Sequence, residues 1–171
     1  MMSFGTEFSA RRMEVQGLMM DPSSRTPIVI LREVDGEAML PIWIGAFEAN
    51  AIAMSIEGVE APRPMTHDLM SQSLESTGAR IERVVISDLS DSTFFASIYL
   101  ELGSDGEVVV LDSRPSDAIA LALRAKAPIF VLDSVLEAAQ RADLVKEGAD
   151  EERLKKWLEE AAPGDLGDYE M

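Results

Sequence analysis

The segment from Asp112 to Arg124 constrains the fold most strongly, because it joins an apolar strand to a helix with almost no polar face. Pro115 suits the first helical position, where a missing N–H costs nothing. Asp117 falls in the first turn and Arg124 in the last turn, where the helix dipole favours an acid and a base, respectively. Alanine, isoleucine and leucine fill positions 118–123. We therefore predict that this helix is buried nearly all round.

Hairpin signals before this helix favour an α+β fold with a mixed, mainly antiparallel sheet. Asp-Gly pairs at 35–36 and 105–106 each separate two apolar segments and predict tight hairpins. Three predicted strands precede a helix in each half, which predicts a three-strand-plus-helix duplication with added helices. The predicted strands are 14–20, 28–32, 38–44, 80–86, 93–101, 107–111 and 129–132, with a turn at 88–92. The other predicted helices are 46–56, 67–76 with Thr66 as its cap, 134–142 and 150–161.

Length and charge predict one folded domain with two extensions. A chain of 171 residues suits a single core, which we place at 13–142. Residues 1–12 are predicted to be a loose leader, and 143–171 an acidic C-terminal helix and tail. The net charge of −16 excludes a uniformly basic face for gripping nucleic acid. A polyanionic substrate would therefore need a local basic patch or metal ions.

Missing residue types exclude several kinds of site. The chain has no cysteine, which rules out a disulfide, a thiolate nucleophile and a zinc–thiolate site. His67 is the one histidine, so a zinc site with several histidine ligands is excluded as well. A metal-dependent enzyme built from this chain would use carboxylates and Mg²⁺ or Mn²⁺. No apolar run reaches membrane-spanning length. The sequence thus predicts a soluble cytoplasmic protein with no membrane partner.

Three segments, in this order and spacing, resemble the bifunctional nuclease (BFN) domain family. They are Leu40-Pro41-Ile42-Trp43-Ile44-Gly45-Ala46-Phe47-Glu48-Ala49, Pro62-Arg63-Pro64-Met65-Thr66-His67-Asp68-Leu69 and the stretch 112–123, with 91–96 between them. The resemblance covers roughly residues 13–136 and implies a sugar-non-specific nuclease acting on RNA and DNA. It also implies a compact α+β domain that self-associates. We predict a homodimer or higher homo-oligomer, because hairpin edges and an amphipathic C-terminal helix each need a partner.

The nuclease hypothesis requires two loops, distant in sequence, to converge on one site. The predicted catalytic residues are His67, Asp68, Arg114 and Asp117, and the predicted substrate-binding residues are Arg63 and Ser116. The predicted metal ligands are Glu48, Asp112 and Asp117. Metal-held water would attack phosphorus, and the arginines would clamp the phosphate.

Structural roles remain open for the same residues. Asp112 can end its strand while Asp117 complements the helix dipole and pairs with Arg114. His67 can hydrogen-bond a loop, and Trp43 is expected in the core rather than as a base-stacking platform. The alternative function is a non-catalytic oligomeric binding or regulatory module, which the strong negative charge favours.

Overall fold

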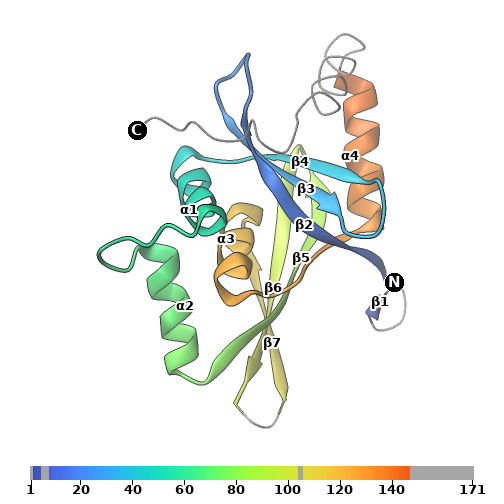
Figure 1. Ribbon diagram of the computed structural model, residues 1–171. Coiled ribbons are helices and arrows are strands. Elements are labelled where there is room, and N and C mark those ends of the chain that lie inside the picture. The colour runs from blue at the N-terminus through green and yellow to red at the C-terminus, as the bar shows by residue number, and fades with distance from the viewer. Residues whose placement is uncertain (1, 5–7, 104–105, 147–171) are drawn as a thin grey trace.

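The computed structural model describes residues 2–4, 8–103 and 106–146, which form one mixed sheet and four helices (Figure 1). The strands are β1 (Met2–Phe4), β2 (Phe8–Met20), β3 (Pro27–Glu33), β4 (Met39–Trp43), β5 (Ala79–Ser90), β6 (Thr93–Leu102), β7 (Glu107–Ser113) and β8 (Ile129–Leu132). The helices are α1 (Ala46–Glu57), α2 (Thr66–Ser76), α3 (Pro115–Ala125) and α4 (Asp133–Lys146). The strand order is β4-β3-β2-β8-β5-β6-β7, and β1 pairs with β2. Only β5 and β8 pair in parallel among these strands, which confirms the predicted α+β class.

The predicted repeat of three strands and a helix is visible in the sheet. Strands β2, β3 and β4 form one antiparallel meander, and β5, β6 and β7 form another. Strand β8 lies between the two meanders and joins them. Helix α1 directly follows the first meander, and α3 directly follows the second. The two equivalent helices pack against each other (Figure 1). Each helix begins within three residues of the end of the preceding strand, so both N-termini lie near the sheet.

Helix α3 is the centre of the core, as its sequence predicts. Its residues 118–122 are each at most 1 % exposed. They pack in one cluster with Leu31, Ile42, Ile52 and Ile86 from the sheet and α1. Helices α1 and α2 both contact α3, which therefore lies between them on one face of the sheet (Figure 1). Burial on this scale explains why α3 carries no polar stripe.

The structure corrects three predicted boundaries. Strand β2 starts at Phe8, because residues 10–13 pair with β8, so the end of the predicted leader belongs to the sheet. The turn predicted at 88–92 contains only Asp91 and Ser92, whose φ angles of 49° and 61° fit a two-residue hairpin turn. Met65, not Thr66, is the N-cap of α2. The predicted helix 150–161 and tail lie outside the described residues. No helix in the described part of the chain has the length and apolar character needed to cross a membrane.

Candidate functional site

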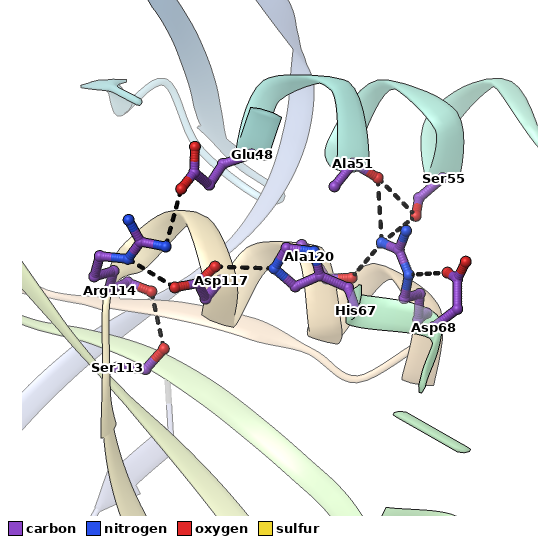
Figure 2. Close-up of polar contacts among 10 residues, drawn as sticks. Glu48, Ala51, Ser55, His67, Asp68, Ser113, Arg114, Asp117 and Ala120 are labelled. Atoms are coloured by element: carbon purple, nitrogen blue, oxygen red, sulfur yellow. Dashed lines mark hydrogen bonds and ion pairs between the residues drawn. The ribbon is translucent and has the colours of Figure 1, made fainter. Parts of the chain in front are cut away.

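Four charged or titratable side chains meet at the start of α3, and we call them the Arg114 network. Arg114 Nε donates to Asp117 Oδ2 at 2.8 Å, and Arg114 Nη2 lies 2.9 Å from Glu48 Oε1. Asp117 Oδ1 lies 2.9 Å from His67 Nε2 (Figure 2). The network thus links α1 through Glu48, α2 through His67 and α3 through Asp117. It confirms that the two sequence segments predicted to converge, around His67 and around Arg114, do so.

Helix starts place these side chains. Gly45 and Arg114 are the N-caps of α1 and α3, and both have extended backbone conformations. Glu48 and Asp117 are each the third residue of their helix, where the helix dipole favours an acid. Because α1 and α3 pack side by side, the two carboxylates face a common guanidinium.

Hydrogen bonding keeps Asp117 ionised. Partial burial alone would raise the pKa of this carboxyl, but the bonds from Arg114 and His67 outweigh it and hold the pKa below its usual value. The same contact with Asp117 raises the pKa of Arg114. An ionised Asp117 can only accept, so His67 donates to it through Nε2–H. In the neutral ring, the lone pair would then be on Nδ1, as a general base requires.

Arg114 is the accessible member of the network, and it borders a hollow. Its side chain is 66 % exposed, whereas those of His67 and Glu48 are 12 % and 18 % exposed. The hollow has a volume of about 350 Å³. It lies between the end of β4, the turn before β6 and the first turn of α3, and Ser116 lines it with Arg114. A guanidinium with N–H groups left over at such a place can bind an anionic group.

A second cluster lies at the other end of α3, and we call it the Arg124 network. Arg124 Nε donates to Asp68 Oδ1 at 2.6 Å, and Nη1 donates to Ser55 Oγ at 2.7 Å. Nη1 also lies within bonding distance of the carbonyl oxygens of Ala51, at 3.2 Å, and Ala120, at 3.0 Å (Figure 2). Asp68 further accepts the backbone N–H of Met65, and these bonds lower its pKa. The side chain of Arg124 is only 12 % exposed.

The other predicted site residues lie apart from the Arg114 network. Asp68 follows His67 in sequence but faces Arg124. Arg63 is exposed on the loop between α1 and α2, and Asp112 is exposed on β7. Within the described residues, no three Asp, Glu or His side chains gather in a way that could hold a metal ion. The predicted ligands Glu48, Asp112 and Asp117 therefore do not fit a metal site, since Arg114 lies between the first and the last of them.

Sequence reasoning missed two features. Arg124 was assigned to the helix dipole, whereas it binds carbonyl and carboxylate oxygens from α1 and α2. Trp43 was expected in the core, whereas it is 45 % exposed on the edge strand β4 and lines the hollow. Pro41 was the available signal for the second, since proline inside a strand is typical of a sheet edge.

Comparison with known proteins shows which family this chain resembles. The model of the bifunctional nuclease domain matches residues 29–143. An uncharacterized protein of Mycobacterium tuberculosis is 36% identical over 163 residues, which cover 89% of this chain and 95% of that protein. "Bifunctional nuclease 2" of rice (Oryza sativa subsp. japonica) is 30% identical over 68% of this chain and 36% of its own length. "Bifunctional nuclease 1" of Arabidopsis thaliana is 29% identical over 61% of this chain and 33% of its own length.

Proposed function

The chain belongs to the bifunctional nuclease domain family, and we propose that it is a nuclease that hydrolyses phosphodiester bonds in RNA, DNA or both. The single observation that carries the proposal is the meeting of His67, Asp117 and Arg114, of which Arg114 borders an open hollow. A general base, an acid that orients it and an anion-binding group are three parts that phosphodiester hydrolysis uses.

Each member of the Arg114 network has a proposed role. Asp117 holds the N–H of His67 and so fixes the ring. His67 takes a proton from the water that attacks phosphorus and returns it to the leaving oxygen as the P–O bond breaks. Arg114 contacts a non-bridging phosphate oxygen and offsets its growing charge. Glu48 holds the guanidinium in place. Arg63 and Ser116 remain proposed substrate contacts.

A cleavage assay with purified protein tests the proposal. Labelled single-stranded RNA and DNA of one sequence are incubated with the protein in EDTA, in Mg²⁺ and in Mn²⁺. These three arms also test the predicted use of Mg²⁺ or Mn²⁺, for which the described residues form no ligand cluster. We expect cleavage, and we expect His67→Gln to reduce its rate about 10²- to 10⁴-fold, the range for loss of a general base. Cleavage by the wild type in none of the arms would contradict the proposal.

The matched control is Arg141→Met. Arg141 is 72 % exposed and pairs with Glu137 on α4, so it resembles Arg114 in exposure and pairing but lies on another element. We expect this variant to cleave at the wild-type rate. An equal loss in Arg141→Met and in His67→Gln would indicate a general effect on the protein rather than loss of a base.

A second candidate function is a non-catalytic binding module. The observation that favours it is charge: Arg114 is shared by two carboxylates, and the whole chain carries −16. Such a surface slows the capture of a polyanion. Absence of cleavage together with saturable binding of a neutral ligand or a protein would support this alternative.

We also propose self-association through the edge strand β7. Val108, Val110 and Leu111 are 45 %, 52 % and 42 % exposed on this strand. Its outer edge has no strand partner among the described residues. Unpaired apolar edges favour pairing with another chain, and two copies of β7 can pair about a two-fold axis. Light scattering at micromolar concentration should give a dimer mass that Val110→Lys reduces. A wild-type monomer mass would contradict this proposal.

A further inference from the structure

The side chain of Trp43 is exposed, so packing in the hydrophobic core does not explain its position. Trp43 ends β4, an edge strand of the sheet, and nearly half of its side-chain surface is open to solvent. It also lines the hollow that Arg114 borders. An aromatic ring and a guanidinium therefore share one opening, although 71 residues of sequence separate them.

The indole ring of Trp43 is fixed although it is exposed. Its Nε1–H donates to Asp21 Oδ2 at 2.9 Å. The other carboxylate oxygen of Asp21 accepts the backbone N–H and the hydroxyl of Ser23, at 2.9 and 2.7 Å. These bonds tie the ring to the turn between β2 and β3. An aromatic face held in one orientation loses little entropy when a ligand stacks on it.

The rest of the lining suits a flat ring with polar edges. Phe94 and Ile42 supply apolar surface, and Thr26 and Thr93 supply hydroxyl groups. The volume of about 350 Å³ is at the lower end of the range for small-molecule sites, about 300–1,000 Å³. Arg114 and Ser116, at the start of α3, form one side of the hollow, and Arg114 also pairs with Asp117.

We infer that this hollow binds one unpaired nucleobase, stacked on Trp43, of a nucleic acid whose phosphate contacts Arg114. The inference rests on the proposed function and gives it a substrate class, single-stranded nucleic acid. Bases in a duplex are stacked on each other, so their faces are not available to a protein side chain. Stacking also needs no positive charge, which suits a chain with a net charge of −16.

Fluorescence titration tests the inference by binding alone. Trp157, the only other tryptophan, is replaced by phenylalanine so that the signal comes from Trp43. The probe is a cleavage-resistant phosphorothioate oligothymidylate in single-stranded form. The same strand in a duplex and an abasic strand of equal length are the matched ligands. We expect the single strand to quench the fluorescence, and the duplex and the abasic strand to bind at least tenfold more weakly.

Variants at the hollow complete the test, with binding followed by anisotropy of a labelled strand. Trp43→Ala should raise the Kd for the single strand by about 10- to 100-fold, as loss of one base–aromatic stack does. It should leave the Kd for the abasic strand unchanged. Trp43→Phe should restore most of the affinity, which excludes misfolding as the cause. The control Phe95→Ala removes another exposed aromatic, from the neighbour of Phe94 on the opposite side of β6.

Three results would overturn the inference: equal Kd values for Trp43→Ala and wild type, equal affinity for base-bearing and abasic strands, or no binding of any strand. The proposed function fails separately. A protein that binds the single strand through Trp43 and cuts nothing would refute the nuclease proposal and leave the base site standing.

Discussion

Two arginines at opposite ends of α3 both bind acidic side chains from neighbouring helices, yet their surroundings differ. Arg124 is 12 % exposed and donates to a carboxylate, a hydroxyl and two backbone carbonyl oxygens. Arg114 is 66 % exposed, and among the described residues its guanidinium binds only the carboxylates of Glu48 and Asp117. A guanidinium has five N–H donors, so Arg114 keeps donors for a ligand.

Both networks are built from arginine–carboxylate ion pairs, but the Arg124 network has a structural role and the Arg114 network a functional one. In the Arg124 network, Nε and Nη1 donate to four oxygens carried by the three helices, so the cluster holds α1, α2 and α3 together. In the Arg114 network, the acids orient the guanidinium, which borders the hollow, and Asp117 also binds His67. Substitutions at the two ends should therefore affect different properties of the protein.

The largest effect on stability is expected from Arg124→Met. Removing the guanidinium takes from the partly buried Asp68 its ion-pair partner and from Ser55 and two helix carbonyl oxygens an additional donor, which costs about 3 kcal/mol. Urea denaturation followed by circular dichroism measures this loss. The control Arg141→Met, at an exposed pair on α4, should change the free energy of unfolding by less than about 0.5 kcal/mol. Equal stabilities of the two variants would contradict the structural role of the Arg124 network.

A smaller effect is expected from Asp117→Asn, and it should depend on pH. At pH 7 the variant should lose about 1–2 kcal/mol, because a carboxylate with two charged or polar donors becomes an amide. The pKa of Asp117 is lowered in the folded state, so its contribution is present above the unfolded pKa and disappears as pH falls through the folded pKa. The two stability curves should therefore approach each other below about pH 4.

Asp112→Asn is the control for Asp117→Asn, and we expect the two variants to differ in stability. Asp112 is exposed on β7 and belongs to neither network. Its substitution should change the free energy of unfolding by less than about 0.5 kcal/mol at pH 7. A gap between wild type and Asp117→Asn that widens in acid would contradict the assignment of Asp117 as an ionised acceptor.

The smallest effect on stability is expected from Arg114→Met. Exposed ion pairs contribute about 0–1 kcal/mol, because water and salt screen them. Thermal and urea denaturation of this variant should resemble those of wild type. A loss comparable to that of Arg124→Met would mean that both networks are structural.

Much of the fold could be predicted from local sequence. The apolar run after Pro115 predicted the buried helix α3, and the Asp35–Gly36 pair predicted its hairpin, because both signals depend on neighbouring residues alone. The strand order could not be predicted the same way, since β8 enters between β2 and β5 only through long-range pairing. For that reason the exposure of Trp43, on the edge strand β4, was missed.

The candidate site could be predicted only in outline. The convergence of His67 with Arg114 and Asp117 was a requirement of the nuclease hypothesis, and the structure meets it. The sequence could not predict which arginine network each side chain of α2 joins, because this depends on how α2 packs across α3. That packing turns His67 toward Asp117 and turns the next residue, Asp68, toward Arg124. Asp68, predicted to be catalytic together with His67, therefore lies in the Arg124 network instead.

The most direct test of the account is the cleavage rate of Arg114→Met on a single-stranded oligonucleotide, measured beside its free energy of unfolding. We expect kcat/KM to fall about 100-fold, as with loss of one group that stabilises transition-state charge, while stability stays within about 1 kcal/mol of wild type. Wild-type cleavage by this variant would contradict the account, because the exposed guanidinium would then play no part in the chemistry.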